Sequence, residues 1–521
     1  MARYVTEQGI AAILPPTTLL DQYGNAIGTA ANPLSTSFPG RKQDVTGRLQ
    51  VSMTQNIYEA DFEYGPQPLR WEALTAGAGT IAALPGSGGV RMRIVNVGDV
   101  TIRQSRPYHR YQPGKAMYMA TAVNFGGANA GQRQRVGFFD DGNGLFLEQG
   151  DPTATNPYGM FACIRSDING VPVDTRVSFE QWTDVNGVKG SINWLNIQML
   201  WMEYAWYGAG LLRWGVILNG EPYALNEFAS GNQLAVPWAR TGNLPVRYEQ
   251  RNITSGVQND MYHYGVSVLV NGRIDPSRGF TYGYGMALSV PTRPIAASST
   301  RFPLLSIAYR PMGTQEYTQA GAAVTAGTTT SITVAGTPWT VGQWVGRYVL
   351  FTGLGSGAGT VARITANTAN TLTFQDNVLG GPIAVTPGAG QPYVIGLINR
   401  GQVLPLQLMV SSSAAATVEL ISSTPTSPVT LTGASFASMA SLGSTQSFVN
   451  RDVSGTALSG GEVVYNAPCP PGGLQVFDLS NFFPLYNTIR GNNPDALTVA
   501  ISTGTTAANV QASLYCQEAM S

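Results

Sequence analysis

Charged residues are scarce in this chain. They make up 12% of its 521 residues, about half the share that is usual in soluble proteins. Thirty Lys and Arg balance thirty Asp and Glu, so no net charge favours nucleic acid or anionic lipid as a partner. Because near-zero net charge promotes association, the composition favours a subunit of an assembly.

Cysteine and histidine are also rare. The three cysteines, Cys163, Cys469 and Cys516, are far apart, which fits neither a disulfide framework nor a zinc site and predicts buried free thiols. The only histidines, His109 and His263, show no metal-ligand spacing such as H-E-x-x-H. We therefore assign no metal-binding or cofactor-binding residues from the sequence.

Long apolar runs are missing as well. No stretch approaches the roughly 18 apolar residues of a membrane span, so no membrane insertion is expected. The N-terminus has no basic segment followed by an apolar run and a cleavage site. This predicts synthesis and folding in a cytoplasm.

Glycine and proline, by contrast, are abundant, with 61 and 32 residues. Residues 1–45 contain Pro15-Pro16 and Pro39-Gly40 with little periodicity, which predicts an extended N-terminal arm that a neighbouring subunit orders. Beyond the arm, short runs rich in aromatic and β-branched residues alternate with turn signals. The fold class predicted is all-β and multidomain.

Residues 46–312 are predicted to form a central jelly-roll-type antiparallel sandwich. The runs 135–139 and 145–148 flank Asp140-Asp-Gly-Asn-Gly144, whose glycines permit the positive φ angles of tight hairpins. Two further hairpins join 161–165 to 171–182 across Asn169-Gly170, and 211–218 to 223–228 across residues 219–222.

Residues 192–207 carry two competing patterns. Helical spacing relates Leu195, Met199, Met202 and Trp206. As a strand, the segment would place on one face Ile197, Met199, Trp201 and Glu203. The flanking hairpins and the glycines that follow favour a buried strand, although the spacing alone does not decide.

After residue 312 the composition changes to Thr, Gly, Ala and Val. Residues 313–396 are predicted to form a small inserted β domain, with strands at 331–334, 348–351, 361–364 and 371–374 and with Trp339 and Trp344 in its core. Residues 397–521 are predicted to form a C-terminal β-sandwich, with strands at 406–410, 417–421, 461–465, 474–479 and 496–502.

Residues 103–115 combine basic and aromatic side chains around His109. Such a stretch can contact phosphate or a polar partner surface. An ordinary turn beside a strand is the favoured interpretation, and His263 is predicted to be a half-buried strand residue. The glycine cluster 353–359 lacks the Gly-Lys-Ser/Thr ending of a phosphate loop and predicts a hairpin turn.

Two carboxylate pairs invite comparison with glycosidases, which need two such groups across a sugar. The pairs are Asp140 with Asp141, and Glu203 with Glu227. The first pair lies in a predicted turn, where aspartate binds its own backbone, and the turn lacks the register of a calcium-binding EF-hand. We assign no catalytic residues, and the sequence predicts that the protein is not an enzyme.

The nine tryptophans and 23 tyrosines suit either sugar-stacking platforms or core and subunit interfaces. Core and interface are favoured, since no exposed polar cluster accompanies a particular aromatic residue.

Several stretches resemble large virion proteins of bacteriophages, namely 46–52, 67–71, 111–115, 135–141 and 243–248. In that group a jelly roll precedes segments similar to 302–307 and 431–436, and residues 339–346 and 357–360 of the insert resemble small β modules of tail and neck proteins. The resemblance implies a structural virion component of the tail or neck, of fibre, collar or baseplate type.

The implied partners are further copies of this chain, with a trimer favoured, and other virion proteins. The virion, assembled in the host cytoplasm, is the expected location. Two alternatives remain open: a capsid decoration protein, and a fibre that binds or cleaves a host-surface glycan.

Overall fold

The computed structural model describes residues 54–206, 211–229, 232–273, 279–286, 292–298, 300–318, 323–354, 359–439, 447–482 and 484–519. Within these ranges the regular structure is β-strand, apart from two short 3₁₀ helices, η1 (Phe179–Gln181) and η2 (Lys189–Ser191). The predicted all-β class is confirmed, and no helix in the described ranges is long and apolar enough to cross a membrane. The predicted arm, residues 1–45, lies outside them.

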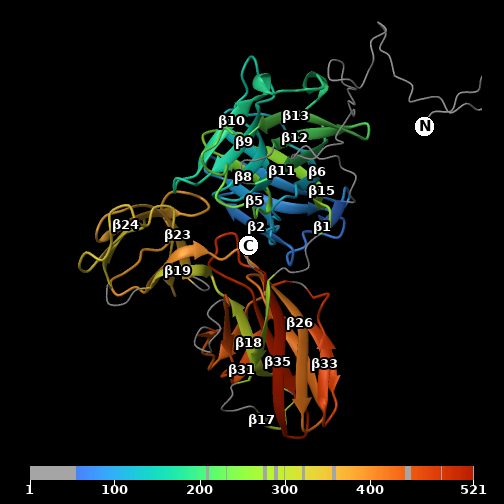
Figure 1. Cartoon of the computed structure of the whole chain (residues 1–521), viewed down its shortest axis with the longest axis vertical. Helices are drawn as coiled ribbons and strands as arrows, with labels where there is room; N and C mark the ends of the chain where they lie inside the picture. The colour runs from blue at the N-terminus through green and yellow to red at the C-terminus, as the bar shows by residue number, and fades with distance from the viewer. Residues whose placement is uncertain are drawn as a thin grey trace, which may run out of the picture. The chain divides into compact units, whose positions relative to one another are not determined.

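Two antiparallel sheets form the first sandwich (Figure 1, blue to green). The eight-stranded sheet contains β1 (Thr54–Ala60), β3 (Thr80–Leu84), β4 (Gly89–Ile94), β6 (Met117–Asn124), β11 (Gln198–Tyr204), β12 (Leu211–Leu218), β13 (Glu221–Ala229) and β15 (Asn259–Asn271). The seven-stranded sheet contains β2 (Trp71–Ala76), β5 (Val100–Ser105), β7 (Gln132–Phe139), β8 (Gly144–Gln149), β9 (Met160–Ser166), β10 (Val173–Ser178) and β14 (Val246–Asn252).

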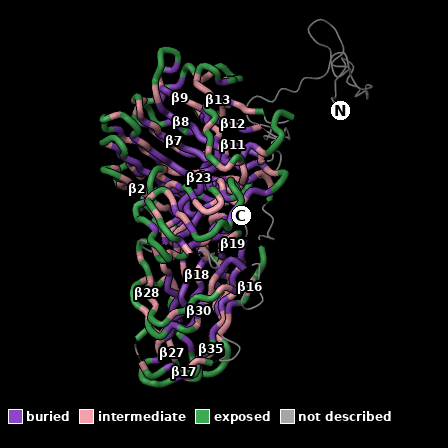
Figure 2. The backbone as a smooth tube through the Cα atoms, turned by 90° about the vertical axis from the view of Figure 1, so that its left-hand side faces the viewer, coloured by how far each residue is buried: buried purple, intermediate pink, exposed green. Residues whose placement is uncertain are grey.

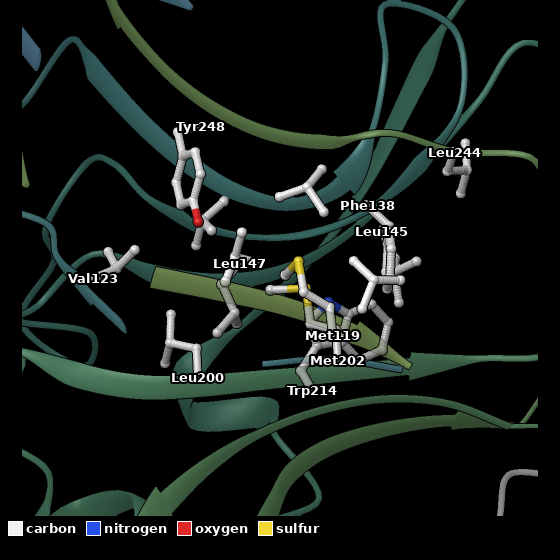
Figure 3. Close-up of a cluster of buried hydrophobic side chains, with 14 of the residues drawn as sticks. Met119, Val123, Phe138, Leu145, Leu147, Leu200, Met202, Trp214, Leu244 and Tyr248 are labelled. Carbon is white, nitrogen blue, oxygen red and sulfur yellow. The ribbon is translucent and has the colours of Figure 1, made fainter. Parts of the chain in front are cut away.

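Alternate side chains of the two sheets meet in one large core. Figure 3 shows Met119 and Met202 of the eight-stranded sheet close to Leu145 of the seven-stranded sheet. The indole N–H of Trp214 crosses the core and donates to the backbone carbonyl of Phe146 over 3.1 Å. Each such large apolar side chain, when fully buried, stabilises the sandwich by about 1.5–3 kcal/mol.

The three predicted hairpins are present. β7 pairs with β8, β9 with β10, and β12 with β13. The last hairpin turns at Asn219 and Gly220, whose φ angles of 53° and 87° match a type I′ turn. The strand expected to run to residue 182 ends at Ser178, where η1 begins.

The ambiguous segment 192–207 contains a strand, β11, which is shorter than predicted. Leu200, Met202 and Tyr204 point into the core, because β11 lies between β6 and β12. On the other face Trp201 and Glu203 are also buried. Residues 192–197 precede the strand as turns, and residue 207 lies outside the described ranges.

The Thr/Gly-rich segment forms a seven-stranded antiparallel sheet (Figure 1, yellow to orange). Its strands are β19 (Met312–Thr318), β20 (Val324–Gly327), β21 (Ser331–Val334), β22 (Tyr348–Thr352), β23 (Gly359–Asn367), β24 (Thr371–Asp376) and β25 (Tyr393–Ile398). Trp339 and Trp344 lie in its core, as predicted. β22 and β23 pair from Thr352 and Gly359 onward, which is the hairpin expected from the glycine cluster.

The C-terminal part contains two larger sheets and a two-stranded one. The five-stranded sheet consists of β16 (Phe280–Gly285), β17 (Arg293–Ile295), β26 (Gln402–Ser412), β33 (Leu474–Asp478) and β35 (Ala508–Ala519). The six-stranded sheet consists of β18 (Phe302–Tyr309), β27 (Ala416–Ser423), β29 (Ala437–Ser438), β30 (Val449–Asp452), β32 (Glu462–Cys469) and β34 (Ala496–Ser502), and the pair consists of β28 (Val429–Thr432) and β31 (Ala457–Gly460).

The predicted boundary at residue 312 differs from the observed pairing. β16 and β17 pair with β35, and β18 pairs with β34. The strands β16, β17 and β18 therefore belong to the C-terminal sheets, and the seven-stranded insert interrupts that sandwich. The alternation of residues along each strand could not reveal this pairing, because the partner strands lie about 200 residues further along the chain.

In each part of the molecule, buried residues are distributed along the strands (Figure 2).

Candidate functional site

A cavity of about 350 Å³ lies where the first sandwich meets the C-terminal sheets. The first sandwich contributes β1, the approach to β2, the loop after β5 and the end of β15, and the C-terminal part contributes β26, β35 and the approach to β34. The cavity is lined by Ile57, Tyr58, Leu69, Arg70, Pro107, Tyr108, His109, Arg110, Gln112, Val270, Arg400, Gly401, Gln402, Leu404, Pro484, Tyr486 and Ala519. We call it the tyrosine–arginine pocket.

The basic and aromatic stretch singled out in the sequence forms one wall of this pocket. Pro107 to Arg110 follow β5 directly, and the amide of His109 donates to the carbonyl of Leu244 over 3.0 Å. The favoured interpretation as a turn beside a strand holds for the backbone, but the side chains of the turn also line a cavity.

His109 is a neutral polar group in the wall. Its side chain is 4% exposed, and Nε2 has no hydrogen-bond partner among the described residues. Burial, with a smaller contribution from the charge of Arg70, lowers the pKa of His109 to about 3. The imidazole is therefore uncharged near neutral pH, and one of its ring nitrogens is buried without a hydrogen bond to the described part of the chain.

Tyr108 and Arg400 form the centre of the site. The guanidinium of Arg400 lies 4.8 Å from the centroid of the Tyr108 ring, a cation–π contact. Arg400 donates to the carbonyls of Thr488 and Ile489 over 2.7 and 2.8 Å, which fixes its plane. The hydroxyl of Tyr108 donates to Asp140 over 3.3 Å.

Tyr58 and Arg70 repeat this arrangement nearby. The Arg70 guanidinium lies 4.7 Å from the centroid of the Tyr58 ring, and it donates to the carbonyl of Glu59. The Tyr58 ring centroid is 5.0 Å from that of His109. Burial, partly offset by Arg70, raises the pKa of Tyr58 above its ordinary range, so its hydroxyl stays protonated.

The C-terminal part closes the pocket with Gln402 and Tyr486. The Gln402 amide donates to the carbonyl of Tyr108 over 3.0 Å, and the backbone N–H of Tyr486 donates to Asp495 over 3.0 Å. Sequence reasoning missed both residues and Arg400, because no local motif marks them.

The first carboxylate pair, Asp140 and Asp141, stabilises the local structure. Asp140 accepts the backbone N–H groups of Gly142 and Asn143, both over 2.8 Å, as expected for an aspartate turn. Asp141 forms an ion pair with Arg247 over 2.7 Å.

The second pair lies on the other sheet of the sandwich. Arg213 binds Glu227 at 2.9 Å and lies 3.8 Å from Glu203. The fold does not unite Asp140 and Glu203, since one follows β7 and the other lies on β11, in different sheets.

A charged layer covers the outer face of the seven-stranded sheet. Arg135 bridges Glu148 and Glu249 over 2.7 and 2.9 Å, and both carboxylates are fully buried. Burial by itself raises the pKa of Glu249, but the charges of Arg251, Arg135 and Arg247 outweigh it and hold that pKa well below its ordinary value. A proton donor for glycoside cleavage needs a raised pKa, so Glu249 is unsuited to that role.

The remaining residues singled out in the sequence are part of the core. All three cysteines are free and buried, as predicted. His263 is fully buried rather than half-buried, because β15 is a central strand and the ring stacks on Tyr248 at 3.9 Å. Among the described residues no group of His, Cys, Asp and Glu could hold a metal ion.

No family model and no curated protein matches the chain. Solved structures do match it. A glycosyl hydrolase family 16 protein from Mycobacterium smegmatis is 13% identical, with 41% of this chain and 100% of that chain covered and a TM-score of 0.28. A beta-1,3-glucanase from Mycobacterium marinum is 10% identical, with 41% and 98% covered and a TM-score of 0.28.

A legume lectin-like domain from Entamoeba histolytica is 11% identical, with 42% of this chain and 98% of that chain covered and a TM-score of 0.26. With TM-scores below 0.5, these likenesses assign no activity to this chain. They nevertheless overturn one expectation: because glucanases stand among the similar structures, the prediction that the protein is not an enzyme is wrong and is withdrawn.

Proposed function

We propose that the protein binds carbohydrate in the tyrosine–arginine pocket. One observation carries this proposal: a cavity of about 350 Å³ combines the rings of Tyr58, Tyr108 and Tyr486 with the polar side chains of arginine, glutamine and histidine. Its size lies within the range of about 300–1,000 Å³ that is typical of ligand sites.

The chemistry of the wall suits a sugar. Aromatic rings pack against the C–H groups of a pyranose, while fixed N–H groups bind its hydroxyls. The Gln402 amide is held by the Tyr108 carbonyl, and Arg400 is held by two further carbonyls. Such prior ordering lowers the entropic cost of binding a flexible polar ligand.

The binding test uses a glycan array probed with the full-length protein, followed by titration calorimetry on the glycans retained. We expect binding to a limited set of glycans, and Gln402→Leu should weaken it at least tenfold. The matched control is Tyr64→Phe, because Tyr64 is 89% exposed and lies outside the pocket lining. Retention of no glycan, or an equal loss in the control variant, would contradict the proposal.

We also propose that this binding protein belongs to a bacteriophage particle, at the tail or neck, as a homo-oligomer. The phage-like sequence stretches and the 12% share of charged residues support this location. Cryo-electron microscopy of particles labelled with an antibody against residues 323–354 tests it. Label over the whole head would indicate the capsid decoration alternative, and particles without label would exclude a virion component.

A further inference from the structure

The lining of the tyrosine–arginine pocket contains more basic than acidic side chains. Arg70, Arg110 and Arg400 line the pocket, and no aspartate or glutamate is among its described lining residues. The chain as a whole has equal numbers of basic and acidic residues, so this local excess of basic side chains arises from the fold.

Arg400 is partly buried and makes no direct salt bridge within the described residues. Burial by itself lowers its pKa, but Tyr108 and the charges of Asp140 and Asp141 outweigh burial and raise it. Arg70 likewise forms no ion pair within the described part of the chain, whereas Arg106 pairs with Asp495 at 2.6 Å a short distance away. An anion that pairs directly with a partly buried guanidinium recovers part of the free energy lost when that charge is removed from water.

The hydrogen bonds of Arg400 leave some of its N–H donors for such an anion. A guanidinium has five N–H donors, and two hydrogen bonds hold Arg400 to the carbonyls of Thr488 and Ile489. Planar carboxylates pair with guanidinium groups through two parallel hydrogen bonds. The Tyr108 ring beneath Arg400 supports the plane in which this pairing occurs.

His109 adds a polar contact without adding charge. The side chain is 96% buried and its Nε2 lacks a partner among the described residues. A neutral imidazole nitrogen suits a ligand hydroxyl or ring oxygen. The pocket lining thus combines two arginines, each against a tyrosine ring, with an uncharged imidazole.

We propose that the ligand of this pocket is an acidic sugar, whose carboxylate pairs with Arg400 and whose ring meets Tyr58, Tyr108 and His109. The inference rests on the proposed carbohydrate binding and narrows it to a chemical class, the uronates and sialic acids.

Titration calorimetry with the full-length protein separates this inference from the proposed function. The probes are glucuronate and N-acetylneuraminate, their neutral counterparts glucose and N-acetylglucosamine, and inorganic phosphate. We expect the acidic sugars to bind at least tenfold more tightly than the neutral ones, with affinity falling as salt is added. Arg400→Met should remove this preference, and Arg400→Lys should keep part of it, because it retains the charge but not the planar pairing.

Arg301→Met is the matched control, because this arginine is 44% exposed, pairs with Glu419 and lies outside the pocket lining. Equal affinity for acidic and neutral sugars would overturn the inference and leave carbohydrate binding intact. Failure of both kinds of sugar to bind would overturn the proposed function as well. Binding of phosphate as tight as that of the acidic sugars would reveal a plain anion site and would also overturn the inference.

Discussion

Glu72 shows how burial changes the chemistry of a single residue. Its carboxylate accepts the backbone N–H of Ile489 over 2.7 Å. Burial raises the pKa of Glu72 to about 7, although the charge of Arg106 and the Ile489 hydrogen bond act in the opposite direction. Between the ordinary pKa of 4.5 and this raised value, at about pH 6, the folded protein therefore holds a proton on Glu72 that the unfolded chain releases.

This proton makes stability depend on pH. The ordinary pKa of 4.5 applies to Glu72 in the unfolded chain, so between about pH 4.5 and 7 the folded state binds more protons and the free energy of unfolding falls as pH rises. Glu72→Gln keeps the acceptor for Ile489 and removes the titration. Because Glu72 retains some solvent contact, we expect the variant to be more stable than wild type by about 1 kcal/mol at pH 8, and equal to it at pH 4.

Urea denaturation at pH 4, 6 and 8 measures this difference. Glu63→Gln is the control, since Glu63 is exposed and its replacement should change little at any pH. A Glu72→Gln variant that is less stable than wild type at pH 8 would show that the ionised carboxylate stabilises the fold.

At the scale of elements, the contact between β11 and β12 depends on a glycine. Gly215 is paired with Trp201 across the two strands, and a Cβ on Gly215 would overlap the Trp201 indole and the carbonyl of Tyr223. The Trp201 side chain is 1% exposed, and its indole N–H donates to the Val216 carbonyl over 3.3 Å. The indole therefore packs directly on the bare backbone.

We expect Gly215→Ala to lower the free energy of unfolding by about 2 kcal/mol, because Trp201 must leave its position against β12. The control is Gly256→Ala, where a Cβ meets open space and a change within about 0.5 kcal/mol is expected. Guanidinium denaturation measures both variants. Equal stability of the two variants would show that Trp201 adjusts without cost.

At the scale of the whole molecule, ion pairs connect the sheet systems, and two of the three are buried. Arg106 of the first sandwich pairs with Asp495 at 2.6 Å, and both side chains are at most 3% exposed. Arg363 of the insert pairs with Asp167 at 2.8 Å. Arg490 pairs with Asp376 of the insert. Together these contacts predict that residues 54–519 unfold as one cooperative unit.

Calorimetry of the Arg106→Met variant tests this coupling. The substitution leaves the Asp495 carboxylate buried without its partner, which costs about 3–5 kcal/mol. We expect the single heat-capacity peak of the wild type to split or to move to a lower temperature. Arg347→Met is the control, since its ion pair with Glu316 is about one-third exposed and contributes less than about 1 kcal/mol. An unchanged single peak in Arg106→Met would contradict the coupling.

The sequence by itself determined the features that depend on neighbours along the chain. Alternating side chains and turn glycines gave the β7–β8 and β12–β13 hairpins, because a hairpin is closed by its own turn. The change of composition near residue 312 located the insert, and Trp339 and Trp344 indicated its core. The basic and aromatic stretch around His109 could also be identified in the sequence, although the sequence favoured an ordinary turn there.

Only the tertiary structure decided the features that unite distant segments. β18 pairs with β34 across nearly 200 residues, and the tyrosine–arginine pocket joins Tyr58 and Tyr108 to Arg400 and Tyr486. Strand registry over such separations is set by core packing between whole sheets, and no local periodicity encodes it. The same holds for charge: a chain with no net charge acquires an arginine-lined pocket because folding brings Arg70, Arg110 and Arg400 together from distant segments.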